Sequence, residues 1–416
     1  MKKFIKKHPI ISTIILFVIG YNFVYFPLKK VMRELFFLPP VMSTGVSTDG
    51  CYVITAHAWR DMNRNFDNNP LVLWDIKNKS KQIIAEKVNP FSAYFIPDSH
   101  EFMWQDNKDV VHIQNIEGKE TLSFKHPRTQ GHLMSADKKT YISATPDWWI
   151  YSGYGKDRKL VLNDDFGSPQ PLNLSLAGNY FLTAGSGIGS VKPIVDTDFK
   201  DKPVIDTGKI PAKFHSSITL WDKNTLQPVT RIRRHNGKIF ALFSPDGKWL
   251  ISGDETGFNY MWSMDNLENR LQLATPLSGI FIQGKNGEPH YWDESQLLAL
   301  PSKFKSRLIM HFTVAYAFLT EKDFIHLGHA YGTKNEDSVV PLYTVGDPWI
   351  KGYLDLQATP RPSLDYYSKS LTVASSYKAH VLVIGQAYKG GISVYQYHPD
   401  KKELERIWVG DDRKYW

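Results

Sequence analysis

Two tryptophans that lie 41 residues apart, Trp221 and Trp262, constrain the fold more than any other feature of this sequence. Between them, short runs rich in β-branched and aromatic residues alternate with Gly, Pro, Asn and Asp. Such runs, bounded by turn residues at intervals of about eight to twelve positions, predict antiparallel strands. A period of about 40 residues is typical of architectures that repeat one supersecondary unit. The segment therefore predicts an all-β fold of repeated sheets.

The stretch from Ser216 to Asn266 contains Trp221-Asp222, His235, Ser244-Pro245-Asp246-Gly247 and Trp262, and Trp74-Asp75 repeats the first pair earlier in the chain. In these residues the stretch resembles a WD40 repeat. The resemblance implies a β-propeller that binds partners, and it does not imply catalysis.

The stretch departs from the family pattern in two places. Ser263 follows the second tryptophan where the family has Asp. The position six residues before each tryptophan, also Asp in the family, holds His215 in one repeat and Thr256 in the next. We therefore expect the family's buried His–Ser–Asp–Trp hydrogen-bond set to be incomplete, so that apolar burial has to stabilise the blades.

From residue 38 onward, seven segments repeat one plan of turn and strand, which predicts seven four-stranded blades, with six or eight as alternatives, in a domain spanning residues 38–416. Two insertions, residues 186–215 and 266–307, exceed the length that a blade needs and are expected to form loops. These loops either recognise the partners of the propeller or have no function of their own. We also expect Leu38–Thr44 to close the ring by pairing beside Ile407–Val409, because a ring without free sheet edges needs such a closure.

The N-terminal region predicts a membrane anchor. Residues 1–8 form a basic flank, and residues 9–28 form an apolar run of twenty residues without a charge. At about 1.5 Å per helical residue this run spans about 30 Å, the thickness of a bilayer core. Residues 29–37 are the linker. The alternative, a cleaved signal peptide, lacks small residues at a cleavage point.

The charge distribution predicts the orientation of the anchor and argues against nucleic acid as a ligand. Residues 1–35 hold seven basic residues and one acidic residue, whereas the remainder holds 43 basic and 41 acidic residues. The basic excess belongs to the anchor and not to a basic face of the domain. Lysines that precede the apolar run favour a cytoplasmic N-terminus and a periplasmic or other extracytoplasmic domain, with a cytoplasmic domain as the alternative.

The sequence contains a cluster of aromatic residues but no catalytic motif. Trp148, Trp149 and Tyr151 form an aromatic cluster, for which burial of both tryptophans between blades is the favoured interpretation. The alternative is that one tryptophan is exposed, and the cluster is then a candidate contact for a ligand or partner. His326 and His329 lie three apart in an expected strand and point to opposite faces, so they could share a metal ion only if the strand contained a β-bulge. Polar packing of the strand is the favoured interpretation. The single cysteine, Cys51, excludes a disulfide within the chain.

The sequence therefore predicts a membrane-anchored, WD40-like propeller that is not an enzyme and needs no cofactor or metal. Its expected role is a protein-binding scaffold or an accessory subunit of a bacterial envelope complex. Protein partners would bind to the loop faces, and residues 9–28 would contact the membrane. A propeller enzyme that uses the central channel, or a carbohydrate or small-ligand binder that uses exposed aromatic residues, is the alternative.

Overall fold

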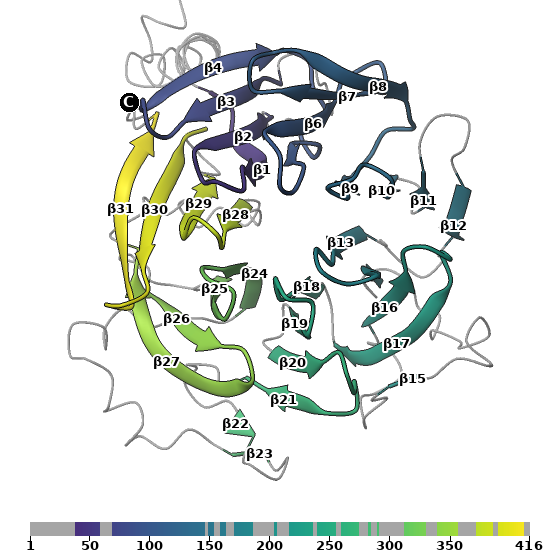
Figure 1. The fold of residues 1–416 in the computed structure, drawn as a ribbon, viewed down its shortest axis with the longest axis vertical. Helices are drawn as coiled ribbons and strands as arrows, with labels where there is room; N and C mark the ends of the chain where they lie inside the picture. The colour runs from purple at the N-terminus through teal and green to yellow at the C-terminus, as the bar shows by residue number, and fades with distance from the viewer. Residues whose placement is uncertain are drawn as a thin grey trace, which may run out of the picture.

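The computed structural model describes residues 38–58, 69–145, 149–153, 159–163, 170–185, 204–205, 216–235, 239–254, 259–273, 282–283, 289–290, 312–329, 339–356, 372–385 and 390–411. In these residues the regular secondary structure is β-strand, arranged as seven sheets of four or five strands around a common centre, with one separate two-stranded sheet (Figure 1). The arrangement is a β-propeller with the seven blades that the repeat plan predicts.

The strands follow the ring in chain order. Blade 1 comprises β1 (Val41–Val46), β2 (Tyr52–His57), β3 (Leu71–Asp75) and β4 (Ser80–Ala85). Blade 2 comprises β5 (Tyr94–Phe95), β6 (Glu101–Gln105), β7 (Val110–Asn115) and β8 (Glu120–Lys125). Blade 3 comprises β9 (Gly131–Met134), β10 (Tyr141–Ala144), β11 (Trp149–Ser152) and β12 (Lys159–Asn163).

The second half of the ring repeats this order with additions. Blade 4 comprises β13 (Gln170–Leu174), β14 (Tyr180–Gly185), β16 (Ser216–Asp222) and β17 (Pro228–His235), joined by β15 (Val204–Ile205). Blade 5 comprises β18 (Ile239–Phe243), β19 (Trp249–Asp254), β20 (Asn259–Ser263) and β21 (Arg270–Gln272). Blade 6 comprises β24 (Phe312–Phe318), β25 (Asp323–His329), β26 (Val339–Thr344) and β27 (Asp347–Asp355). Blade 7 comprises β28 (Thr372–Ser376), β29 (Val381–Gly385), β30 (Ile392–His398) and β31 (Glu403–Gly410). The separate sheet pairs β22 (Ile282–Gln283) with β23 (Pro289–His290).

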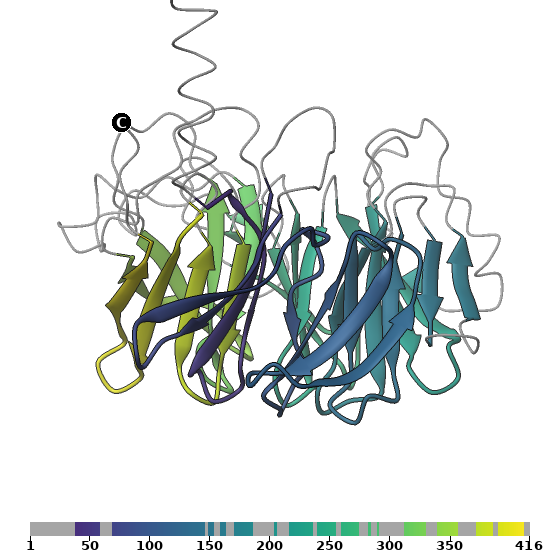
Figure 2. The same ribbon diagram turned by 90° about the horizontal axis from the view of Figure 1, so that it is seen from above.

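Strand direction gives the propeller two distinct ends. The four main strands of each blade run antiparallel from the centre outward, so the first and third turns of a blade lie at one end. The other end, here called the connection face, carries the second connection of each blade and the link to the next blade. In blade 1 it is marked by Val41 at the start of β1, paired with His57 at the end of β2. The opposite end, called the turn face, carries the short turns that lie at the lower edge of the ribbon in Figure 2.

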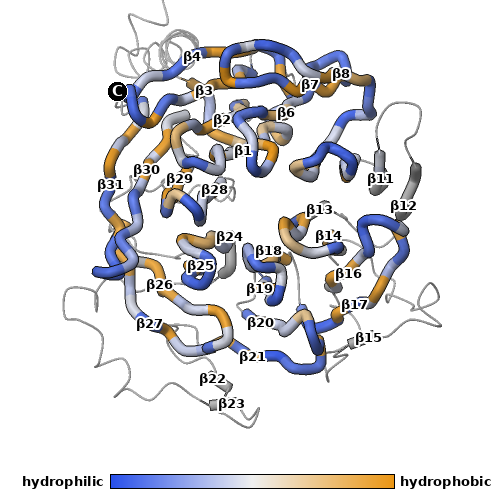
Figure 3. Tube along the Cα trace, viewed as in Figure 1, coloured by the Kyte–Doolittle hydropathy of each residue, from blue (hydrophilic) through white to orange (hydrophobic). Residues whose placement is uncertain are grey.

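Apolar side chains fill the space between every two neighbouring blades. Seven clusters of buried hydrophobic residues each draw members from two adjacent blades. Consecutive residues of one strand enter different clusters, as Val53 packs toward blade 7 and Ile54 packs toward blade 2. Both faces of a blade are therefore buried, and its middle strands are apolar over consecutive positions, such as β26 and β29 (Figure 3).

The ring closes without the strand exchange that the sequence led us to expect. Leu38–Thr44 does not pair beside Ile407–Val409, because β1 pairs with β2 as the innermost strand of blade 1. The chain from Thr372 onward supplies four consecutive strands, so blade 7 is complete without a strand from the N-terminus. Side chains join the two blades instead. Thr44 and Thr372 share a hydrogen bond of 2.8 Å, and Lys81 forms a 2.8 Å ion pair with Asp411.

The second insertion begins later than predicted. Residues 266–273 belong to blade 5, because they contain β21 and the buried Leu273. The excess chain is therefore the connection of residues 274–311, of which only β22 and β23 are described. Within the described residues no helix is long and apolar enough to cross a membrane. The predicted membrane span, residues 9–28, lies outside them.

Candidate functional site

A buried hydrogen-bond network in blade 5 fixes the tryptophan that first marked the repeat. Trp262 Nε1 donates to Ser252 Oγ at 2.7 Å, and the same oxygen lies 2.9 Å from His235 Nε2. His235 Nδ1 lies 3.2 Å from Asp254 Oδ2, and both of these side chains are fully buried. The expectation of an incomplete His–Ser–Asp–Trp set was therefore wrong for this blade. The carboxylate comes from the end of β19, two positions after the serine and hence on the same face of the strand.

In blades 1 and 4 a smaller version of this network provides the hydrogen-bond acceptor for the indole N–H of the tryptophan. Trp74 Nε1 donates to Thr55 Oγ1 at 2.7 Å, and Trp221 Nε1 donates to Thr183 Oγ1 at 2.9 Å. In blade 1 the position two residues after the threonine is His57, whose Nε2 lies 2.7 Å from Thr55 Oγ1. Each network satisfies an indole N–H that would otherwise be buried without a partner. These residues stabilise blades and are not available to a ligand.

The turn face repeats a second polar device in blades 1, 3 and 5. The first turn of each blade has a serine followed two residues later by an aspartate, and the serine hydroxyl donates to the carboxylate at 2.6, 2.6 and 2.5 Å. The serine oxygen also accepts the backbone N–H five residues further on, and the aspartate accepts the N–H two residues after itself. The three pairs are Ser47–Asp49, Ser135–Asp137 and Ser244–Asp246.

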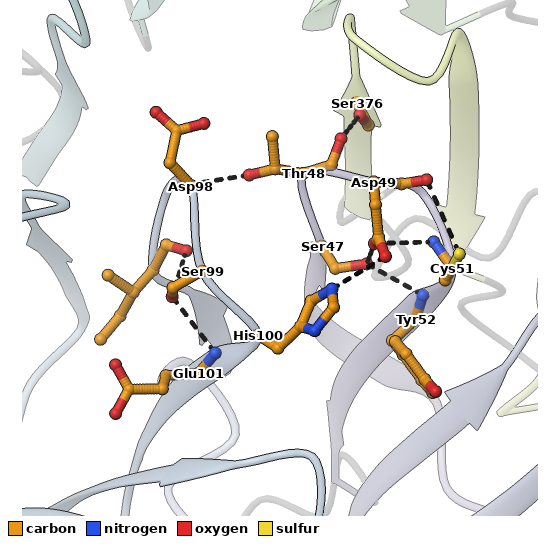
Figure 4. A network of polar contacts seen from close by, with 11 residues as sticks. Ser47, Thr48, Asp49, Cys51, Tyr52, Asp98, Ser99, His100, Glu101 and Ser376 are labelled. Carbon is orange, nitrogen blue, oxygen red and sulfur yellow. Dashed lines mark hydrogen bonds and ion pairs between the residues drawn. The ribbon is translucent and has the colours of Figure 1, made fainter.

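Polar contacts join the first turns of blades 7, 1 and 2 into one group, here called the turn cluster (Figure 4). Thr48 lies between its neighbours, because its hydroxyl accepts the Asp98 N–H at 2.8 Å and its carbonyl accepts the Ser376 hydroxyl. His100 Nε2 lies 2.8 Å from Asp49 Oδ2. Lys378 of blade 7 reaches across blade 1 to Asp98 of blade 2 at 2.6 Å. This turn cluster fixes the seam between the first and last blades.

The turn cluster contains Cys, His, Asp and Ser side chains, but their arrangement does not activate a nucleophile. Partial burial alone would raise the pKa of Asp49, but hydrogen bonds from Ser47, the Cys51 N–H and His100 outweigh burial and lower it to about 2. Burial and the neighbouring Asp49 raise the pKa of Cys51, so its thiol stays protonated near neutral pH. His100 contacts a carboxylate and neither the thiol nor the serine hydroxyl.

The repeat residues that the sequence singled out stabilise the blades or their turns. Trp74, Trp221, Trp262 and His235 are buried, whereas Asp75, Asp222, Asp246 and Gly247 lie in or beside turns. Asp75 and Asp222 accept backbone N–H groups of Asn78 and Asn224. Gly247 has a φ of 71°, which favours glycine.

The predicted aromatic contact site is only partly described. The backbones of Trp149 and Tyr151 lie in β11, and Trp148 falls outside the described residues. The burial or exposure of this cluster therefore stays a prediction. His326 is buried in β25 and stacks on Tyr316 with ring centroids 5.3 Å apart, in accordance with its interpretation as polar packing.

Two features of the site were not recognised in the sequence. The family's aspartate is expected six residues before the tryptophan, which is Thr256 in this blade. The carboxylate that contacts His235 belongs instead to Asp254, because the length of the connection between β19 and β20 could not be known from the sequence. The spacing Ser-x-Asp in a strand, as in Ser252–Asp254, is the signal that finds it. The contact of Asp98 with Lys378 joins residues 280 positions apart, and no local pattern predicts it.

Comparisons with known proteins agree with this architecture. No family model matches the chain. The β-propeller domain of Myceliophteria thermophila Cps50 (Swd1) superposes with a TM-score of 0.52 at 8% identity, over 86% of this chain and 97% of that one. Kluyvelomyces marxianus Hsv2 superposes with a TM-score of 0.50 at 8% identity, over 90% of this chain and all of the other. The fold is that of a WD40-like β-propeller.

Relatives found by sequence match only parts of this chain. Protein HIR1 of Candida albicans is 41% identical over 58 residues, which are 14% of this chain and 6% of that protein. Cilia- and flagella-associated protein 52 of Sus scrofa is 23% identical over 216 residues, which are 47% of this chain and 32% of that protein. The chain thus spans less than a third of the length of either curated relative. These partial matches carry no activity to this chain.

Proposed function

We propose that the chain is a membrane-anchored, WD40-like propeller that serves as a protein-binding scaffold, an accessory subunit of an envelope complex on the extracytoplasmic side. The observation that carries this proposal is the common position of the two long insertions. The first joins Gly185 at the end of β14 to Ser216 at the start of β16, and the second joins β21 to β24. Both attach at the connection face.

The start of the propeller lies at the same end, because Val41 opens β1 there. The linker of residues 29–37 spans at most about 30 Å when fully extended. An anchor at residues 9–28 would therefore hold the connection face toward the bilayer. A partner bound by the insertions would lie between the propeller and the membrane, as an accessory subunit of a membrane complex requires.

The anchor is tested separately from the partner. Deleting residues 1–37 should move the propeller from the membrane fraction to the soluble fraction, while the full chain should resist extraction by high salt and alkali. If the full chain washes off under those conditions, or if the deleted form stays with the membrane, the anchor is refuted.

The partner is tested by mild crosslinking in the native cell, detergent extraction and capture of the full-length chain. Two variants replace residues 186–215 or 274–307 with a short Gly–Ser linker, and a control changes Asp98 and Lys378 of the turn face to alanine. We expect a stoichiometric protein partner that is lost from at least one trimmed variant and kept by the control. Recovery of the chain alone would refute the scaffold and favour a propeller enzyme or a carbohydrate binder. If the partner is lost only from the control variant, the binding surface lies on the turn face and not on the insertions.

A further inference from the structure

The outermost strand of blade 4 differs from those of the other blades in the described part of the chain, because another segment pairs with it. β15 lies beside β17 in parallel orientation, with Val204 opposite Arg231 and Ile205 opposite Ile232 (Figure 1). β15 belongs to the first insertion, and it reaches past β16 to the outer edge of the sheet. The insertion therefore supplies a fifth strand to its own blade.

Burial along β17 agrees with this cover. Thr230, Arg231 and Ile232 are 2%, 6% and 0% exposed, so three consecutive residues of an outermost strand are buried. In blade 1 the corresponding strand β4 is largely exposed, and its Ile83 is 52% exposed. Ile232 packs in the apolar cluster between blades 4 and 5. The burial of Thr230 and Arg231 beside it agrees with the pairing of β15 along this part of β17.

The sequence of the first insertion contains the pairing segment twice. Residues 202–207 read Lys-Pro-Val-Ile-Asp-Thr, and residues 192–197 read Lys-Pro-Ile-Val-Asp-Thr. The two hexapeptides differ only in the order of their β-branched pair. In both hexapeptides a proline precedes two β-branched residues, which favour a strand, and an aspartate follows them. The strand that pairs with β15 carries Arg231, Arg233 and Arg234.

We propose that the outer edge of β17 is a docking edge for an extended protein segment with the pattern Lys-Pro, two β-branched residues, Asp and Thr. β15 occupies this edge in cis. Residues 192–197 have the same sequence chemistry as the hexapeptide that contains β15, and a partner protein binds by displacing β15. Main-chain hydrogen bonds supply the affinity of such strand addition, and the side chains supply its selectivity. A tethered segment competes at an effective concentration in the millimolar range, so only a partner held nearby displaces it.

This inference deepens the proposed scaffold role, and it is tested with purified protein so that its failure is distinct from failure to capture a partner in cells. The probe is a fluorescent peptide of residues 200–209. The full-length chain in mild detergent is compared with a variant in which Ile194, Val195, Val204 and Ile205 are replaced by Gly or Ser. Anisotropy should show peptide binding to the variant at least tenfold tighter than to the unchanged chain, because the cis competitor has been removed.

Hydrogen exchange places the bound peptide. The β17 amides that face β15, at and beside Arg231 and Ile232, should lose protection in the variant and regain it when the peptide is added, while amides of β30 should not change. A peptide with the same composition in scrambled order is the matched control and should bind at least tenfold more weakly. Equal binding to the variant and the unchanged chain, binding to neither, or unchanged protection of β17 would overturn the proposal.

Discussion

Three buried histidines make the stability of the propeller sensitive to mild acid. Burial lowers the pKa of His57 and His132 to about 4 and that of His326 to about 3. In the unfolded chain a histidine titrates near pH 6.5. Between these values the unfolded chain binds a proton that the native protein excludes. The free energy of unfolding therefore falls as the pH decreases below 6.5, and the loss from each residue levels off only below its native pKa.

The size of this effect follows from the two pKa values. Lowering the pH from 7.5 to 5.5 should decrease the free energy of unfolding by about 1.3 kcal/mol for each histidine, or about 4 kcal/mol for the three. That is a large part of the stability of an ordinary domain, which is about 5–15 kcal/mol. Urea unfolding of the full-length chain in mild detergent, followed by tryptophan fluorescence at both pH values, measures the loss.

The variant His57→Gln measures how much of the pH-dependent decrease in unfolding free energy comes from His57. The variant is less stable at both pH values because the contacts of His57 with Thr55 and the Pro39 carbonyl change. Its decrease between pH 7.5 and 5.5 should nevertheless be smaller than that of the unchanged chain by about 1.3 kcal/mol. Ile54→Val is the control, because it destabilises the same blade without removing a titrating group. If His57→Gln loses as much stability on acidification as the unchanged chain, the reasoning is refuted.

Further predictions concern the networks and the seam. Ser252→Ala should decrease the free energy of unfolding by about 1–3 kcal/mol, and a double-mutant cycle with Trp262→Phe should show coupling. Gly390→Ala should destabilise the seam, because φ is 63° and the new methyl group would overlap the backbone carbonyls before β1. Gly118→Ala, with a φ of 87° and open space, is its matched control and should cost about 1 kcal/mol. Lys378→Ala should change the unfolding free energy by less than about 1 kcal/mol, since its ion pair is exposed; a larger loss measured by urea unfolding would contradict this.

The repeat and its turns were predictable from the sequence because they depend on local chemistry. The segment Ser244-Pro245-Asp246-Gly247 combines a serine and an aspartate that close the turn with a glycine of positive φ. The spacing of Trp221 and Trp262 reflects the same place in successive blades. Residues that act within one turn or one strand thus predicted the fold class and the number of blades.

The contacts between distant segments were not predictable in the same way. Whether Leu38–Thr44 completes blade 1 or blade 7 depends on how many strands the other end of the chain supplies, and strand patterns near residues 372–410 did not settle that number. The pairing of Val204 with Arg231 joins a loop to a strand through backbone groups, which any residue carries. Backbone pairing and ring closure are properties of the whole chain.

Closure through side chains has a consequence for how the molecule assembles. Each blade takes its four main strands from one continuous stretch of chain, so the blades can form one after another during synthesis. Only the docking of blade 1 against blade 7 joins the two ends of the domain, and it has to come last. The ring could also open between blades 1 and 7 without breaking the hydrogen bonds of any pair of strands. Opening would break only side-chain contacts across this seam.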